Sequence, residues 1–71
     1  MKVWFCRDKD GDCSTWDGVK LIHKPKLEDG IFKGRGPCLT SSSFGTFEMF
    51  GNGFHGVKKG RCKLLEFEPL I

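Results

Sequence analysis

Three aspartates near the start of the chain alternate with other residues and could supply oxygen ligands to a cation. They lie in residues 8–12, DKDGD. A calcium loop of the EF-hand type needs oxygen ligands at positions 1, 3 and 5, a glycine at 6 and an acid at 12. Starting at Asp8 puts Cys13 at the glycine position, and starting at Cys6 puts a thiol at position 1. The spacing therefore predicts no tight calcium site.

The same stretch has the residues of a tight turn between two strands. Asp at the first position and Gly at the fourth position of a type I turn fit residues 8–11, and the glycine would take a positive φ. A four-residue loop would place Arg7 opposite Asp12 and Cys6 opposite Cys13, and a three-residue loop would still keep the two cysteines close. We therefore expect a β-hairpin at this position.

Cysteine and histidine are the other residues that could hold a metal ion. The four cysteines contain no C-x-x-C spacing and the histidines are isolated, so we predict no metal site, no cofactor and reduced thiols. Two alternatives stay open: a Cys6–Cys13 disulfide under oxidation, and a zinc site assembled from separate strands. The residues concerned are Cys6, Cys13, Cys38, Cys62, His23 and His55.

Motifs for catalysis and nucleotide binding are weak. Residues 51–56, GNGFHG, match G-x-G-x-x-G, but too little chain follows for the helix and second parallel strand that the fingerprint needs. No serine, histidine or acid is spaced as a nucleophile with its base. We expect a protein that is not an enzyme.

Length and composition indicate one small domain, residues 1–71. The chain is 38% hydrophobic and 30% charged, and seven Phe and two Trp supply the core. We expect Phe47 and Phe67 in that core. No apolar run approaches the ~18 residues of a membrane span, and no signal segment is recognisable before the first expected strand. These features favour a cytoplasmic protein without membrane contact.

Turn residues recur every eight to twelve positions, which is typical of β-rich folds. Asp17-Gly18 is a two-residue hairpin signal, so we predict strands over residues 12–16 and 19–24. A further turn at residues 28–30 precedes a short strand at 31–33.

The C-terminal half is less regular. Within residues 41–50, a strand over residues 46–50 fits better than a helix over residues 44–50 capped by the serines at 41–43. Residues 61–70 fit a closing strand. The prediction is a small all-β or β-rich domain with at most one short helix. Its strands, about five, would form an antiparallel meander, as a twisted sheet or open barrel with one edge formed by an early strand and another near the C-terminus.

An aromatic-led first strand and its turn give the chain a resemblance. Trp4, residues 7–11 (RDKDG), residues 24–25 (KP) and residues 29–32 (DGIF) resemble a pattern in short proteins carried by phages and prophages. The resemblance covers about residues 4–34. Such proteins mostly have no assigned activity, so the resemblance implies a viral or mobile-element setting and no mechanism.

Positive charge is concentrated in the middle of the chain. Residues 18–65 carry nine Lys and Arg against three acids, although the whole chain is only +3. The cations fall into two groups, around residues 20–35 and 58–63. The positions that we expect to be exposed and to contact a partner are Lys58, Lys59 and Arg61, with Lys24, Lys26 and Arg35 as the second group.

Two functions are compatible with these features. The first is a non-catalytic binding module, a phage-carried effector or inhibitor that docks on a host protein. The alternative is a single-stranded nucleic-acid-binding β-domain, in which the cations contact phosphates and Phe47, Phe50 and Phe54 stack on bases.

Overall fold

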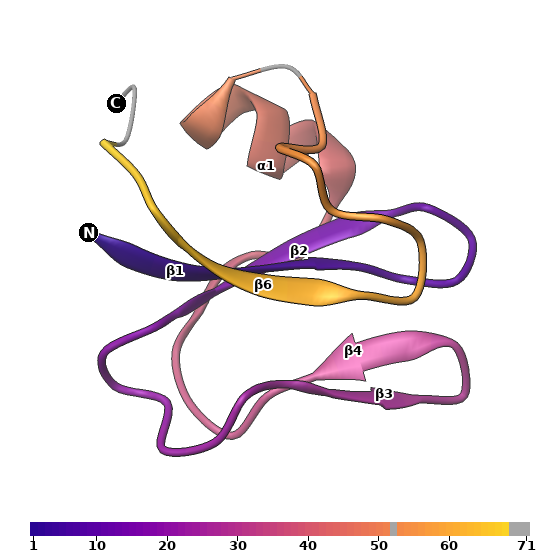
Figure 1. Ribbon diagram of the computed structural model, residues 1–71, viewed down its shortest axis with the longest axis horizontal. Helices are drawn as coiled ribbons and strands as arrows, with labels where there is room; N and C mark the ends of the chain where they lie inside the picture. Colours follow the sequence, from indigo (N-terminus) through magenta and orange to yellow (C-terminus); the bar gives the residue numbers. More distant parts are fainter. Residues whose placement is uncertain (52, 69–71) are drawn as a thin grey trace.

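In the computed structural model, which describes residues 1–51 and 53–68, the chain forms six strands and one helix (Figure 1). A four-stranded antiparallel sheet has the order β5-β2-β1-β6, and β3 and β4 form a separate two-stranded sheet. The sheet is not closed into a barrel, and the predicted class, a β-rich domain with one short helix, is confirmed. The elements are β1 Lys2–Arg7, β2 Cys13–Asp17, β3 Lys26–Glu28, β4 Ile31–Lys33, β5 Cys38–Thr40, α1 Ser43–Phe50 and β6 Cys62–Glu66.

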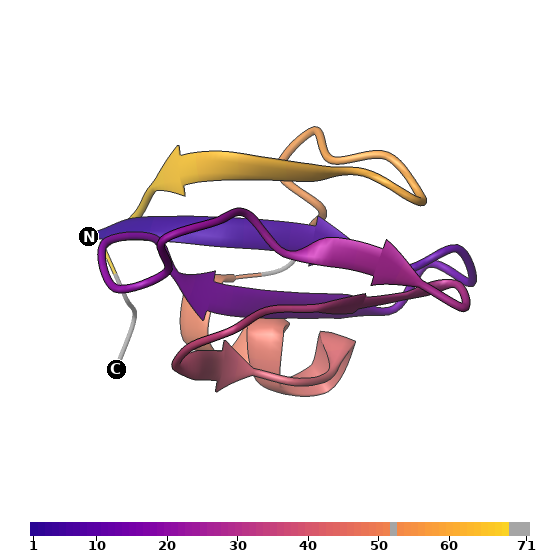
Figure 2. The same ribbon diagram turned by 90° about the horizontal axis from the view of Figure 1, so that it is seen from below.

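The four-stranded sheet is covered on both faces. Helix α1 lies on one face and the β3–β4 hairpin on the other (Figure 1), and Figure 2 looks onto the hairpin side. Because side chains alternate along a strand, consecutive residues of β1 point to different layers. Phe5 and Cys6 are accordingly both fully buried, one under each layer.

The layer between sheet and helix is the main hydrophobic core. Three of its residues form a buried cluster, and three half-buried residues pack against it, including both phenylalanines expected in the core. The aromatic rings are in mutual contact; for example, the Phe50 and Phe67 centroids are 4.8 Å apart. The cluster consists of Phe5, Cys13 and Val57, with Phe47, Leu65 and Phe67 against it.

The layer between sheet and hairpin is smaller. Leu21, Pro25 and Phe32 are buried there. Leu27 and Phe32 are cross-strand partners in the hairpin and alternate with exposed residues. The hairpin therefore has one apolar side toward the sheet and one side toward solvent.

The first hairpin forms, but its predicted register is wrong by one residue. Arg7 pairs with Cys13, and Cys6 with Ser14. Within the loop the Gly11 N–H donates to the Asp8 carbonyl and Gly11 has φ +96, as predicted for the turn. Asp12 belongs to the loop and not to the strand, so the loop is one residue longer than predicted. The two cysteines therefore do not face each other.

The predicted second hairpin at Asp17-Gly18 does not form. The Asp17 carboxylate accepts the N–H groups of Val19 and Lys20, which bends the chain into a turn instead of a strand. The Gly18 N–H donates to the Lys2 carbonyl, and a Cβ at Gly18 would lie 2.9 Å from that oxygen. The glycine is therefore required for close approach to β1, and no strand forms over residues 19–24.

The predicted strand over residues 46–50 is also wrong, because Ser43–Phe50 is helix α1. Ser42 caps the helix and accepts the Gly45 N–H, as the rejected alternative required. The closing strand is shorter than predicted, Cys62–Glu66, and part of the predicted range, residues 69–70, lies outside the described residues. β6 forms one edge of the sheet, as expected, but the other edge is β5 and not an early strand, because β1 and β2 are the central strands. Among the described residues, no helix has the length and apolar character needed to cross a membrane.

Candidate functional site

The solvent side of the β3–β4 hairpin is basic. Alternation along the short strands turns Leu27 and Phe32 toward the sheet and leaves Lys26 and Lys33 exposed. Lys26 and Lys33 are direct cross-strand partners. Like charges directly opposite each other destabilise an antiparallel pair. The hairpin therefore carries an electrostatic arrangement that its own stability does not explain.

The segment that enters the hairpin adds a further cation through a buried proline. Pro25 is among the fully buried side chains, whereas its neighbours Lys24 and Lys26 are exposed. A proline held against the sheet fixes the backbone direction and so presents the two lysines together on the outside.

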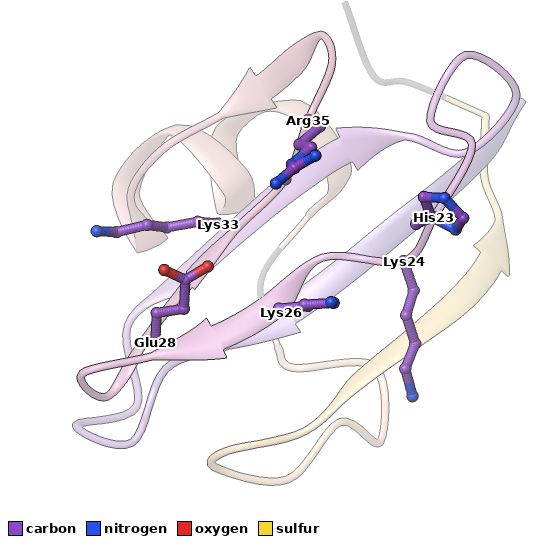
Figure 3. A pocket seen from close by; sticks show the side chains of 7 residues that line it. His23, Lys24, Lys26, Glu28, Lys33 and Arg35 are labelled. Atoms are coloured by element: carbon purple, nitrogen blue, oxygen red, sulfur yellow. The ribbon is translucent and has the colours of Figure 1, made fainter.

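These residues line an open groove of about 330 Å³. Figure 3 shows its side chains coming from β3, β4 and the segments before and after the hairpin. Four cations and one histidine face one acid there, so the groove suits an anionic ligand. Its lining residues are His23, Lys24, Lys26, Glu28, Lys33, Gly34 and Arg35.

A second groove, of about 450 Å³, continues from the first toward the edge strand β6. Lys24 and Lys26 line both grooves, and Arg61 and Cys62 line the second. The structure thus brings together Lys24, Lys26, Arg35 and Arg61, four of the six cations predicted from the sequence. We call the two grooves together the basic groove.

Lys58 and Lys59 are exposed as expected but line neither groove. The Lys59 side chain covers the first turn, where its Cε would lie 3.1 Å from a Cβ at Gly11. Of the first predicted group, Lys58, Lys59 and Arg61, only Arg61 belongs to the basic groove, whereas all three residues of the second group do.

Asp8 fixes the position of the hairpin relative to the four-stranded sheet. Its carboxylate accepts the Phe32 N–H at 2.8 Å, and the neighbouring Lys9 N–H donates to the Gly30 carbonyl at 3.0 Å. Burial raises the pKa of Asp8, opposed by the hydrogen bond from Phe32. The sequence indicated a turn at this position and gave no signal for this long-range contact.

Asp12 plays the corresponding part on the helix side. Its carboxylate accepts the Ser43 N–H at 2.8 Å and the Ser43 hydroxyl at 2.6 Å. These hydrogen bonds lower the pKa of Asp12. Asp8 and Asp12 therefore each act as a bracket, that is, a carboxylate that hydrogen-bonds one covering layer to the first turn of the central sheet. Across the described residues, no group of three or more His, Cys, Asp or Glu is arranged to hold a metal ion.

The aromatic residues expected to stack on bases lie on the other side of the sheet. Phe50 is buried in the helix-side core, and Phe47 contacts Phe54 with centroids 5.4 Å apart. The Arg7 guanidinium lies over the Phe54 ring, 3.6 Å from its centroid. The cations of the basic groove and these three phenylalanines therefore lie on opposite sides of the sheet.

Sequence reasoning missed Cys62 as a residue of the site. Its position in the basic groove depends on the pairing of β6 with β1, which has no local signal. Comparison with known proteins adds no further guide, because no protein-family model, curated protein or solved structure matches the chain.

Proposed function

We propose that the protein is a non-catalytic binding module whose basic groove docks on an acidic surface of another protein. The observation that carries this proposal is the direct cross-strand pairing of Lys26 with Lys33 on the exposed side of the hairpin. The two side chains extend in opposite directions from the paired positions (Figure 3), so they present positive charge along the groove to an anionic partner. In the setting implied by the resemblance to phage-borne proteins, the partner is a host protein.

A protein partner is favoured over a single nucleic-acid strand by two features of the groove. Among the described residues, no Phe or Trp lines the hairpin groove, and the buried Phe32 is the only one that lines the second groove. Base stacking supplies much of the affinity of single-strand binders. In addition, Ile22 is 89% exposed and directly precedes His23 and Lys24. An apolar residue beside a polar rim is typical of protein interfaces.

The test compares two double variants with the same change in charge. The first variant, Lys24→Glu with Lys26→Glu, reverses the charge of two groove residues. The second, Lys58→Glu with Lys59→Glu, reverses the charge of two residues outside the groove. The wild-type protein and both variants are immobilised and exposed to host lysate with and without nuclease treatment, and retained proteins are identified by mass spectrometry.

We expect acidic proteins to be retained by the wild type and by the Lys58, Lys59 variant, and to be lost with the groove variant. Equal loss with both variants would contradict the proposed groove. Retention that disappears after nuclease treatment would favour the nucleic-acid alternative instead. Unchanged melting temperatures exclude unfolding as the cause.

A further inference from the structure

Cys6 and Cys62 are direct cross-strand partners on β1 and β6. The next pair along the ladder is hydrogen-bonded, because the Arg7 N–H donates to the Arg61 carbonyl at 2.9 Å. Hydrogen-bonded and non-hydrogen-bonded pairs alternate in antiparallel sheets, and the Cα atoms of the second kind are about 4.5 Å apart. That separation lies within the range of about 4.4–6.8 Å that a disulfide spans. The backbone therefore needs no rearrangement to join the two sulfurs.

The two thiols differ in their access to solvent. Cys6 is 0% exposed beneath the hairpin layer, whereas Cys62 is half-buried and lines the second groove. The same groove contains Lys24, Lys26 and Arg61. A dissolved oxidant therefore reaches Cys62 first, at a site surrounded by positive charge.

The electrostatic environment gives Cys62 the most thiolate character of the four cysteines. A side-chain hydrogen bond from Cys6 lowers the pKa of Cys62 to about 7, against the effect of burial and with help from Lys24. The same hydrogen bond raises the pKa of Cys6. Burial raises the pKa values of Cys13 and Cys38. Since the thiolate is the nucleophile, Cys62 should react fastest.

We propose that Cys62 is a site of oxidation by hydroperoxides and that Cys6 resolves it into a disulfide across β1 and β6. The Cys62 thiolate attacks one peroxide oxygen, the O–O bond breaks, and the departing oxyanion takes up the proton that Cys62 released. Cys62 is then a sulfenic acid. The Cys6 sulfur loses its proton and attacks the Cys62 sulfur, and the hydroxide that leaves combines with this proton to form water. Two thiols and one hydrogen peroxide thus give one disulfide and two waters, with two electrons passing from sulfur to peroxide.

The experiment uses the full chain carrying Cys38→Ser, which removes the exposed thiol and with it disulfide-linked dimers. The protein is treated with one equivalent of hydrogen peroxide at neutral pH. We expect the loss of two thiols and of the mass of two hydrogen atoms, and a peptide map that joins Cys6 to Cys62. Adding Cys13→Ser should leave this result unchanged. Adding Cys6→Ser should stop the reaction at a sulfenic acid on Cys62 that a cyclic 1,3-diketone traps.

A second measurement does not depend on whether the Cys6→Ser variant folds. In the wild-type chain, iodoacetamide should alkylate Cys62 faster than the more exposed Cys38 at neutral pH, and Lys24→Gln should slow Cys62 alone. Alkylation of Cys38 before Cys62 would overturn the proposal. So would a peptide map in which peroxide joins Cys62 to any cysteine other than Cys6, or leaves both Cys6 and Cys62 reduced.

Discussion

The two faces of the central sheet differ in the apolar surface that they bury and in the charge on the layer that covers them. On the helix face, Phe5 and Cys13 are almost completely buried and contact an aromatic cluster that includes Phe67. On the hairpin face, Phe32 and Pro25 hold a thin layer whose outer surface is lined with cations. Apolar burial contributes free energy roughly in proportion to area. The helix face therefore supplies most of the stability, and the hairpin face supplies the charged surface.

A substitution at the centre of the helix face should cause the largest loss of stability. Phe5→Ala removes a fully buried ring and leaves a cavity in the aromatic cluster. Such substitutions reduce the free energy of unfolding by about 3–5 kcal/mol, which is comparable with the whole stability of a small domain. We expect the backbone amide chemical shifts of the variant to show the narrow dispersion of an unfolded chain. Phe44→Ala is the control, because Phe44 on α1 is 80% exposed and its loss should leave the spectrum and melting temperature nearly unchanged.

Removal of the Asp8 bracket should have the next largest effect and should act on the hairpin face. Asp8 is only 8% exposed, and its carboxylate is the acceptor for the Phe32 N–H. Asp8→Ala leaves that buried donor without a partner, which destabilises by about 1–3 kcal/mol. Hydrogen exchange should accelerate over residues 26–33 while helix α1 keeps its protection. Uniform acceleration across the sheet and helix would show that the hairpin is not a separate layer in energetic terms.

The same conservative substitution at the two brackets should change the pH dependence of stability in opposite directions. The folded-state pKa of Asp12 is lowered, so its contribution is present above the ordinary value of 3.8 and is lost as pH falls through the lowered pKa. The folded-state pKa of Asp8 is raised, so its contribution to stability declines as pH rises from about 3.8 through the raised pKa. Asn keeps an oxygen acceptor and removes the charge.

At neutral pH, Asp12→Asn should therefore lower the melting temperature, whereas Asp8→Asn should leave it unchanged or raise it. Near pH 3 the difference between the two variants should shrink. Melting temperatures measured by circular dichroism across this range provide the test. A melting temperature of Asp8→Asn below that of Asp12→Asn at neutral pH would contradict the assignment of the two carboxylates.

The sequence predicted local structure where a local signal was sufficient. Asp29-Gly30 forms the tight turn expected there, with φ values of 53 and 80, and Ile31–Lys33 is the predicted strand. The similar dipeptide Asp17-Gly18 failed as a hairpin signal because Gly18 contacts the backbone of Lys2 on β1. That contact joins segments distant in the sequence, so neither composition nor spacing indicates it.

The same distinction applies to the helix and to the site. Ser42 was a recognisable cap, but the bond from Ser43 to Asp12 that fixes the helix on the sheet spans 31 positions. Lys24 and Lys26 of the basic groove were named from charge alone, but Lys33, the cross-strand partner of Lys26, was not among the predicted residues. The contribution of Arg61 and Cys62 to the groove could not be predicted from charge, since it depends on which strand β6 joins.

The smallest expected effect on stability would sharpen the functional side of the comparison. Lys33→Glu replaces the like-charge cross-strand pairing with Lys26 by an opposite-charge pairing. Such pairs contribute roughly 0.2–1 kcal/mol, so the variant should melt at a slightly higher temperature than the wild type. Lys58→Glu makes the same change in net charge outside the basic groove, and it should leave the melting temperature nearly unchanged.

If the groove binds an acidic surface, Lys33→Glu should also weaken retention of the acidic partner, because it removes a cation and introduces a carboxylate at the contact. Greater stability with weaker binding would identify the lysine pair as a feature kept for recognition. A variant that is both less stable and equally well retained would show that Lys33 belongs to the fold and not to the interface.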